Sequence, residues 1–257
     1  MQKTLLVTGA SSGIGRATAL LAASRGYAVA VHYHRQEAEA EAVVAQIRAG
    51  GQRALALHAD LRSADELEQL YARVDRELGP LDAVVNSAGV GIARAPVAEL
   101  KSADLERLMS LNVTGLILSC REASKRLSRS RGGRGGVIVN VSSMAATIGG
   151  RPGSAAYAAS KAAVDAFTVG LAKELASEGV RAISVRPGMV VTEMTAAALA
   201  EPSFAATIAA SIPLGRPAQV AEVALPIVWL LSEEASFISG TCIDISGGGF
   251  HVAGASS

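Results

Sequence analysis

This chain has few aromatic side chains and few cysteines, and it has no excess of positive or negative charge. Aromatic residues make up 4% of the 257 residues, and the formal net charge is +1. A balanced charge supplies no overall field for nucleic acid or for an anionic membrane surface. The two cysteines, Cys120 and Cys242, lie in different apolar segments and match no metal-ligand spacing, so we expect free thiols in a reducing compartment.

Long apolar runs and a leader pattern are missing as well. No apolar run approaches the roughly 18 residues that would suggest a membrane span, and no basic-then-apolar segment precedes the first expected strand. We therefore expect no signal peptide, no membrane partner and a cytoplasmic protein. The chain shows no linker and no repeat at a fixed period, which predicts a single domain over residues 1–257.

What the chain does have is an abundance of small and branched apolar residues, within a hydrophobic share of 50%. Short apolar runs alternate with longer helical patterns, and several runs are apolar on consecutive residues, as in strands covered on both faces. The expected strands are 4–8, 28–33, 54–58, 83–86, 137–141, 182–185 and 242–245, and the clearest expected helices are 13–25, 37–49, 63–78 and 154–177. Repeated β-α-β units predict an α/β fold, a doubly wound parallel sheet of about seven strands with helices on both faces.

A glycine-rich turn joins the first expected strand to the first expected helix. Glycine lets the backbone turn tightly and approach a pyrophosphate, and a helix N-terminus offers unpaired N–H groups and the positive end of its dipole. The spacing G-x-x-x-G-x-G could serve structure alone, but its position directly after the first strand favours a dinucleotide site. The candidate cofactor-binding residues of this turn are Gly9, Ser11, Ser12, Gly13, Ile14 and Gly15.

The end of the second expected strand bears on the choice between NAD(H) and NADP(H). An NAD site carries an acidic side chain there that binds the adenosine ribose, but this chain reads His32-Tyr33-His34-Arg35. Arg16 lies in the first helical turn, where a cation opposes the helix dipole and a bound anion would offset that cost. We therefore expect Arg16 and Arg35, with His34 as a weaker candidate, to hold the 2′-phosphate of NADP(H). The alternative is that both arginines are solvated surface charges.

The histidines near this strand do not predict a metal site. His32 and His34 lie on one face of a strand and could meet His58 from its neighbour, but no carboxylate organises the three side chains. Metal-ligating histidines are normally oriented by such a partner. We therefore expect no metal in this protein.

Polar and small residues follow two further expected strands. Asp60 and Leu61 follow the third strand, and Asn86, Ala88 and Gly89 follow the fourth. Open α/β sheets bind ligands at the carboxyl ends of their strands, so these residues are candidates for the cofactor site. Asp60 would meet the adenine amino group, and Ala88 and Gly89 allow close backbone approach. Asn86 either contacts the cofactor or ties strand ends together as a structural residue.

A tyrosine and a lysine one helical turn apart form the candidate chemical site. Tyr157 and Lys161 are four positions apart and so share one helix face. A tyrosine hydroxyl titrates at about pH 10, and a neighbouring ammonium favours the phenolate. A phenol tuned in this way can donate a proton to a carbonyl oxygen as hydride arrives from a nicotinamide, or accept one in reverse. Surface pairs share this spacing, but Ser142 and Ser143 at the preceding strand end strengthen the chemical interpretation.

In combination, these motifs make the chain resemble the short-chain dehydrogenase/reductase family over essentially its whole length. The resemblance implies a Rossmann fold in which Tyr157 is the general acid/base. It implies that Lys161 lowers the pKa of that phenol and holds the nicotinamide ribose, and that Ser143, chosen over Ser142, orients the substrate oxygen. It further implies that Asn112 helps to hold a proton-relay water. The residues that would line the nicotinamide are Pro187, Gly188, Val190 and Thr192.

The resemblance has one departure and leaves the substrate open. The family commonly has a second Asn where this chain has Ser87, at a position that is more structural than chemical. Its members act on small-molecule carbonyls or secondary alcohols, include 3-oxoacyl-thioester reductases and sugar dehydrogenases, and usually assemble as tetramers. We therefore expect a homo-oligomer. Residues 189–215 form an Ala-rich insertion, interpreted as a lid over an apolar, uncharged substrate, although core packing would have the same composition.

Two alternatives to catalysis stay open. The segment 126–136 is rich in Arg and Gly and is expected to be a mobile, solvated loop. Binding of single-stranded RNA by this segment is disfavoured because it contains no stacking aromatic. Docking of an acidic acyl carrier, as in the related 3-oxoacyl reductases, would use the positive charges of Lys125, Arg126, Arg129 and Lys173, and the nearby Glu174 and Glu178 weaken this alternative. The second alternative is an NADP(H) sensor without turnover, which would keep the glycine turn but would not need Tyr157 or Lys161.

Overall fold

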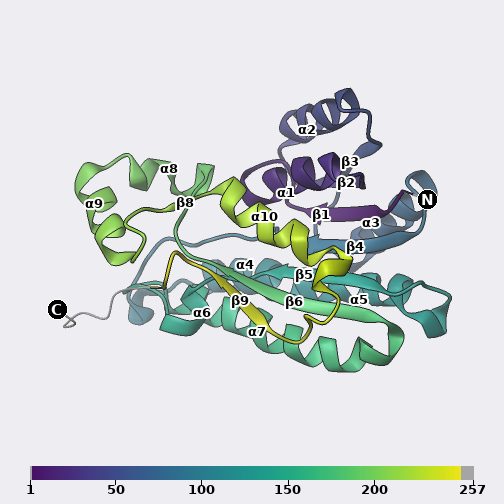
Figure 1. The fold of residues 1–257 in the computed structure, drawn as a ribbon. Coiled ribbons are helices and arrows are strands. Elements are labelled where there is room, and N and C mark those ends of the chain that lie inside the picture. Colours follow the sequence, from purple (N-terminus) through teal and green to yellow (C-terminus); the bar gives the residue numbers. More distant parts are fainter. Residues whose placement is uncertain (1, 250–257) are drawn as a thin grey trace.

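A seven-stranded parallel sheet forms the centre of the structure, a computed structural model that describes residues 2–249 (Figure 1). The strand order is β3-β2-β1-β4-β5-β6-β9, and every neighbouring pair is parallel. The strands are β1 (Thr4–Thr8), β2 (Ala28–Tyr33), β3 (Ala54–His58), β4 (Leu81–Asn86), β5 (Gly136–Val141), β6 (Val180–Pro187) and β9 (Cys242–Ile245). The prediction of a doubly wound, Rossmann-like sheet is confirmed. The expected domain of residues 1–257 extends at both ends beyond the described residues.

Helices cover both faces of this sheet. One face packs against α1 (Gly13–Ser24), α2 (Glu37–Ala49) and α10 (Val220–Leu230), and the other packs against α3 (Ala64–Glu77), α5 (Leu116–Leu127) and α7 (Ala155–Leu175). Successive strand residues point to opposite faces, so Leu5 and Val7 join the first cluster while Leu6 joins the second. This double burial explains why the strands are apolar on consecutive residues.

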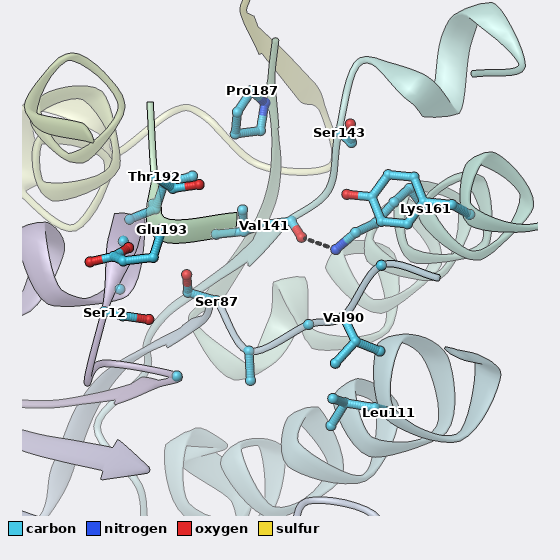
Figure 2. Close-up of a pocket in the computed structure, with 18 of the residues that line it drawn as sticks. Ser12, Ser87, Val90, Leu111, Val141, Ser143, Lys161, Pro187, Thr192 and Glu193 are labelled. Carbon is cyan, nitrogen blue, oxygen red and sulfur yellow. Dashed lines mark hydrogen bonds between the residues drawn. The ribbon is translucent and has the colours of Figure 1, made fainter. Parts of the chain in front are cut away.

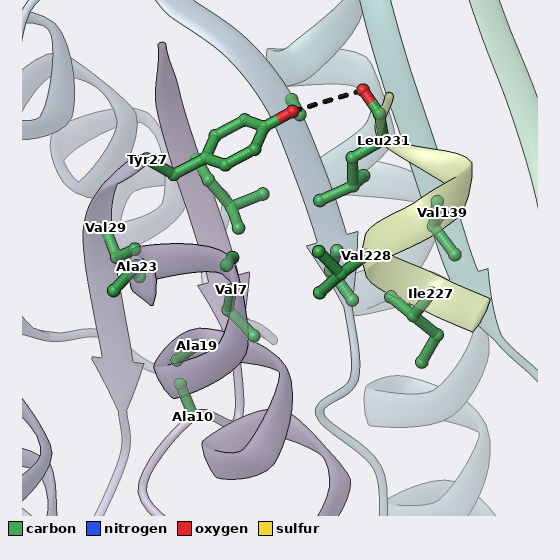
Figure 3. Close-up of a cluster of buried hydrophobic side chains, with 14 of the residues drawn as sticks. Val7, Ala10, Ala19, Ala23, Tyr27, Val29, Val139, Ile227, Val228 and Leu231 are labelled. Carbon is green, nitrogen blue, oxygen red and sulfur yellow. Dashed lines mark hydrogen bonds between the residues drawn. The ribbon is translucent and has the colours of Figure 1, made fainter. Parts of the chain in front are cut away.

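The hydrophobic cluster beneath α10 packs the N-terminal elements β1 and α1 against α10. Figure 3 shows Val7 of β1 and Ala19 and Ala23 of α1 on one side of it, with Ile227 and Val228 of α10 facing them. At its edge, the Tyr27 hydroxyl donates a hydrogen bond of 3.1 Å to the carbonyl oxygen of Leu231. The C-terminal helix thus fixes the layer that carries the glycine turn.

Shorter elements lie around both ends of the strands. They are α4 (Ser102–Met109), α6 (Ala145–Ile148), α8 (Glu193–Leu199) and α9 (Pro202–Ser211), the π-helix η2 (Ser110–Gly115), the 3₁₀-helices η1 (Val97–Glu99), η3 (Arg129–Arg131), η4 (Ala176–Glu178) and η5 (Glu233–Ala235), and a second small sheet of β7 (Val190–Val191) and β8 (Ala218–Gln219). Strands of two residues carry no periodic pattern, so the sequence did not predict the small sheet. In Figure 1, α8 and α9 form a lobe beside the sheet.

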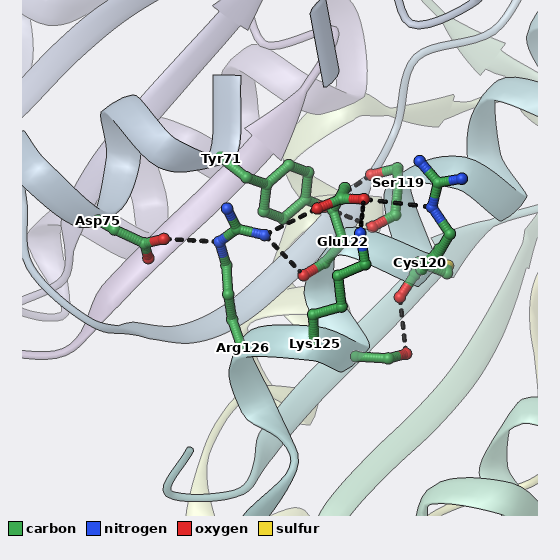
Figure 4. Close-up of polar contacts among 9 residues, drawn as sticks. Tyr71, Asp75, Ser119, Cys120, Glu122, Lys125 and Arg126 are labelled. Carbon is green, nitrogen blue, oxygen red and sulfur yellow. Dashed lines mark hydrogen bonds and ion pairs between the residues drawn. The ribbon is translucent and has the colours of Figure 1, made fainter. Parts of the chain in front are cut away.

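The Arg-Gly segment 126–136 is packed at both of its ends, whereas residues 129–132 and Arg134 are exposed, as expected for a surface loop. Figure 4 shows the Arg126 guanidinium between Asp75, at 2.6 Å, and Glu122, at 3.0 Å. A Cβ atom added at Gly133 would lie 2.3 Å from the carbonyl oxygen of Arg126, and one added at Gly135 would lie 2.4 Å from that of Gly179. The glycines therefore permit close backbone packing.

Residues 2–249 contain neither a membrane-spanning helix nor a metal-binding cluster. No helix in this range combines the length and the apolar character needed to cross a bilayer. The same range holds no cluster of three or more His, Cys, Asp or Glu side chains with metal-binding geometry. The two cysteines are free thiols; Cys120 is buried and Cys242 is half-buried.

Candidate active site

One cleft of about 750 Å³ runs along the carboxyl ends of the central strands. Its walls come from the glycine turn between β1 and α1, from the segments that follow β2 to β6, and from α7 and α8. Figure 2 shows Ser12 and Ser87 at one side of this space and Ser143 and Lys161 at the other. The cleft therefore brings together two groups of residues that are far apart in the sequence.

The glycine turn is held by direct backbone contact with the segment after β4. Gly9 has φ +65°, and a Cβ atom added there would lie 2.8 Å from the Cα atom of Ala88. One added at Gly15 would lie 2.2 Å from the carbonyl oxygen of Gly9. The Thr8 hydroxyl accepts hydrogen bonds from the backbone N–H groups of Ser87 and Ala88, at 3.1 and 3.2 Å. Only glycine fits at these two positions of the turn.

The N-terminus of α1 opens onto the cleft with the features of an anion site. Ser12, Gly13 and Ile14 all line the cleft. The Ser12 hydroxyl makes no capping hydrogen bond to the first turn, and that turn contains no acidic residue. Its N–H groups and its dipole are thus available to a phosphate group, so these residues fit the pyrophosphate of a dinucleotide.

A buried histidine positions the glycine turn. His32 is 2% exposed, and its Nδ1 atom accepts a hydrogen bond of 3.0 Å from the N–H of Gly9. Because Nδ1 is the acceptor, Nε2 carries the proton and donates it to the carbonyl oxygen of Ala59 at 3.0 Å. Burial lowers the pKa of His32 to about 4, so the ring is neutral. The sequence indicated His32 only as a possible metal ligand, because a histidine within a strand that is buried throughout gives no separate signal of this role.

The adenosine end of the cleft contains one cation that the sequence did not single out. His34, Arg35, Asp60 and Leu61 line the cleft as expected residues, and Arg62 joins them. The Arg62 guanidinium contacts Asp60 at 2.6 Å, and this contact lowers the pKa of Asp60 to about 2. The expected adenine contact of Asp60 would therefore be made by a carboxylate already paired with Arg62.

Three of the expected site residues lie outside the lining of the cleft. Arg16 is exposed on α1 and is not among the residues that line it. Asn86 is buried, donating to the Asn140 side chain at 2.9 Å and accepting from the Ser119 hydroxyl at 2.7 Å. This environment matches the alternative that Asn86 ties strand ends together.

Asn112, the third of these residues, fixes the segment after β4 from behind. It lies in the π-helix η2, and its side-chain oxygen accepts a hydrogen bond of 2.8 Å from the Val90 N–H. Its amide nitrogen donates to the Val90 carbonyl oxygen at 2.9 Å. A wider π turn is a common way to direct a side chain at a functional site. Gly89 lies against both Asn112 and Lys161: a Cβ atom there would be 3.3 Å from the Asn112 oxygen and 3.5 Å from the Lys161 Nζ.

Tyr157, Lys161 and Ser143 meet at the other end of the cleft. The Lys161 Nζ donates to the Val141 carbonyl oxygen at 2.9 Å (Figure 2) and lies 6.0 Å from the centroid of the Tyr157 ring. Ser142 is buried and donates its hydroxyl proton to the Lys161 carbonyl oxygen at 3.0 Å. The hydroxyl of Ser142 is thus occupied in holding α7, whereas the less buried Ser143 lies near Tyr157.

Burial dominates the electrostatics of this trio. It raises the pKa of the Tyr157 phenol, although hydrogen bonding to Ser143 lowers it, and it lowers the pKa of Lys161 to about 8. The structure therefore differs from the expectation of a phenol made more acidic by Lys161, because removal from water disfavours both the phenolate and the ammonium. The phenol is protonated at neutral pH and can act as a proton donor.

The remaining wall of the cleft follows β6. Pro187, Gly188, Val190 and Thr192 all line it, as does Glu193 at the start of α8. Thr192 begins α8 through reciprocal capping with Thr195. The Glu193 carboxylate, which the sequence did not indicate, would lie 3.6 Å from a Cβ atom added at Gly13. A bound pyrophosphate at the α1 N-terminus would repel this carboxylate.

Comparison with known proteins gives a consistent result. A family model described as short chain dehydrogenase matches residues 3–203. An uncharacterized oxidoreductase of Escherichia coli, YgfF, is 44% identical over 95% of this chain and 98% of its own length. A 3-oxoacyl-[acyl-carrier-protein] reductase of Synechocystis is 40% identical over 95% of each chain. The crystal structure of a dehydrogenase/reductase from Sinorhizobium meliloti matches with a TM-score of 0.89 at 35% identity, covering 96% of this chain and 94% of that one.

Proposed function

The chain belongs to the short-chain dehydrogenase/reductase family and is an oxidoreductase, and from this premise we propose that it uses NADP(H) to interconvert a carbonyl and a secondary alcohol. The observation that carries the proposal is that the glycine turn, Ser143, Tyr157 and Lys161 line one cleft. When bound there, the nicotinamide would donate or accept the hydride. The chain's own residues would handle the proton and hold the two reactants.

Each polar group at the chemical end has a distinct proposed role. The Ser143 hydroxyl orients the substrate oxygen, and the Tyr157 phenol donates its proton to that oxygen in reduction or accepts one in oxidation. Lys161 holds the nicotinamide ribose, and its ammonium stabilises the phenolate that remains after proton transfer. Asn112 is a positioning residue that fixes the Val90 backbone, beside which the expected relay water would sit. Pro187, Gly188, Val190 and Thr192 form the nicotinamide wall.

The glycine-turn end supports the choice of a phosphorylated dinucleotide. Gly9, Ser11, Ser12, Gly13, Ile14 and Gly15 would surround the pyrophosphate, with Ala88, Gly89 and Leu61 beside it. Arg35, His34 and Arg62 line the adenosine end and suit the 2′-phosphate of NADP(H). Arg16 would contribute from the exposed first turn of α1 by long-range attraction.

Steady-state kinetics with the two cofactors tests this proposal. Purified protein is assayed with NADPH and with NADH against ketones, aldehydes, sugars and 3-oxoacyl thioesters. We expect kcat/KM for NADPH to exceed that for NADH by about 10-fold or more, as one charge-assisted contact to the phosphate would give. Equal efficiency with both cofactors would contradict the NADP(H) assignment, and no turnover with either would favour a sensor.

Reduction of a 3-oxoacyl thioester is the second candidate, because a relative that is 40% identical carries that name. Two of the four basic residues expected to dock an acyl carrier, Lys125 and Arg126, are already engaged within the chain. Lys125 and Arg126 contact the buried Glu122 carboxylate at 2.7 and 3.0 Å (Figure 4). Activity with a carrier-bound substrate that is lost on Lys125→Ala, with small thioesters unaffected, would support docking at this site.

The lid and the oligomer complete the proposal. Residues 189–215 contain α8 and α9, which we assign as a lid over the substrate end. Three exposed apolar side chains, Leu225 and Trp229 on α10 and Phe237 beyond it, suit an interface between copies in a homotetramer. Sedimentation equilibrium of the wild type and of Phe237→Asp measures the assembly directly; a monomeric wild type would contradict it.

A further inference from the structure

Two arginines from different loops stack on one aromatic ring of the lid. The guanidinium carbon of Arg94 lies 6.0 Å from the centroid of the Phe204 ring, and that of Arg151 lies 5.7 Å from it. Arg94 follows β4, Arg151 lies between α6 and α7, and Phe204 belongs to α9. Three segments that are distant in the sequence therefore converge on a single contact.

The two arginine-bearing loops are held together by their backbones. The Ala95 N–H donates to the Gly153 carbonyl oxygen at 3.2 Å. Gly153 has φ +79°, and a Cβ atom added there would lie 3.1 Å from the Cβ atom of Arg94. The backbone contact between the two loops therefore holds the two guanidinium groups close together, and no bridging anion is needed to bring them there.

Neither charge is balanced within the part of the chain that the structure describes. No carboxylate there lies within 4.0 Å of Arg94 or Arg151, whereas Arg107, on the same cleft, pairs with Asp104 at 3.5 Å. Burial and the charge of Arg94 both lower the pKa of Arg151. Contact with an aromatic face offsets only part of the cost of two like charges.

The two acidic residues of the lid segment 189–215 have other contacts. The Glu201 carboxylate caps α9, accepting from the Phe204 N–H at 2.8 Å. The Glu193 carboxylate lies toward Gly13 of the glycine turn. The arginine pair is therefore a preformed cationic site with no carboxylate partner among residues 2–249, and it suits an anionic ligand.

This site borders the substrate end of the cleft through Arg94, whereas Arg151 and Phe204 are not among the residues that line it. Arg94 lines the same cleft as Ser143 and Tyr157, together with Ser154, which follows the loop of Arg151. Planar guanidinium groups match carboxylate and phosphate oxygens in a forked geometry. Resting on the proposed function, we propose that the carbonyl substrate carries an oxyanionic group, a carboxylate or a phosphate, which Arg94 and Arg151 bind while Phe204 holds their planes. This replaces the expectation of an uncharged substrate, which was based on the apolar composition of the lid.

A matched pair of substrates tests the proposal. Oxo acids with increasing spacing between the carbonyl and the carboxylate are compared with their methyl esters, using wild type, Arg94→Met, Arg151→Met and the double variant. We expect the wild type to prefer one acid over its ester. Each single change should lower kcat/KM for that acid by about 10-fold and the double change by about 100-fold, as loss of charge-assisted contacts predicts. The esters should change by less than about 3-fold.

Further arms identify the anion and separate this inference from the proposed function. Acyl-pantetheine with and without its 4′-phosphate replaces the acid and the ester, so preference for the phosphorylated form would assign the anion as phosphate. The control Arg131→Ala also removes one positive charge, from an exposed residue on a distant loop. It should leave the ratio of kcat/KM between the two members of each substrate pair unchanged. The inference would be overturned if the arginine variants lowered kcat/KM equally for the acid and the ester, or changed neither value. A rise in KM for NADPH in place of these effects would also overturn it. Absence of carbonyl reduction with every substrate would overturn the proposed function itself.

Discussion

The two ends of the cleft are built by different means. At the cofactor end, Gly9 and Gly15 lie in backbone contacts that leave no room for a side chain, and His32 is buried beneath them. At the substrate end, Gly91 has nothing within 4 Å of an added Cβ atom, and Arg94 is exposed. The geometry of one end is therefore set by the main chain, whereas the properties of the other are set by side chains on loops. Such a division allows the substrate to change while the cofactor site is kept.

The sharpest test of this contrast places the same substitution at both ends. Gly15→Ala puts a Cβ atom 2.2 Å from the Gly9 carbonyl oxygen, and we expect it to lower the free energy of unfolding by about 3 kcal/mol and to weaken binding of NADPH. Gly91→Ala should change stability by less than about 0.5 kcal/mol. Urea unfolding and fluorescence titration with NADPH measure both. Equal tolerance of the two changes would break the comparison.

Acid should destabilise the cofactor end through His32. The pKa of His32 is lowered to about 4 in the folded protein, against about 6.5 in an unfolded chain. The unfolded state therefore binds the proton first as pH falls, so the stability contribution is complete above about pH 6.5 and is lost progressively toward pH 4. The loss from this group amounts to roughly 3 kcal/mol.

Unfolding free energies at several pH values between 7 and 4 measure this loss. In His32→Asn, the decline with acid should be shallower than in the wild type. The control His58→Asn, on the adjacent strand and exposed, should retain the wild-type slope. A His32→Asn slope equal to that of the wild type would contradict the role of His32 as a buried acceptor for the Gly9 N–H.

The smallest expected effect concerns the choice of cofactor. Arg35→Ala should lower kcat/KM for NADPH by about 10-fold, because it removes a charge-assisted contact to the 2′-phosphate, and leave that for NADH within about 2-fold. Steady-state kinetics with both cofactors and one substrate measures the ratio. If Arg62→Ala had this effect and Arg35→Ala did not, the selective cation would be the one that the sequence did not indicate.

The sequence predicted the sheet well because its strands are buried on both faces. All seven strands of the main sheet were expected from consecutive apolar residues, and the turn of Gly9 to Gly15 was expected from its glycines and its position. The small sheet of β7 and β8 was not, because two-residue strands have no period. The close backbone packing at Gly133 and Gly135 was not predicted, because glycine is typical of loops as well as of close backbone contacts.

The site was predicted less completely because some roles depend on three-dimensional neighbours. Tyr157 and Lys161 stand out by helical spacing, and the structure places them in the cleft with Ser143. The acceptor role of His32 and the convergence of Arg94 and Arg151 on Phe204 arise from segments far apart in the chain. The direction of the phenol pKa also depends on burial, which a pair of residues four positions apart does not reveal.

The central claim is that the Tyr157 phenol transfers the proton while the rest of the cleft holds the cofactor. Rapid mixing of protein, NADPH and a reducible carbonyl separates binding, seen as nucleotide fluorescence, from oxidation, seen as absorbance loss. For Tyr157→Phe we predict a Kd for NADPH within about 3-fold of the wild type and oxidation slower by about 10²- to 10⁴-fold. Oxidation at the wild-type rate without that hydroxyl would contradict the account.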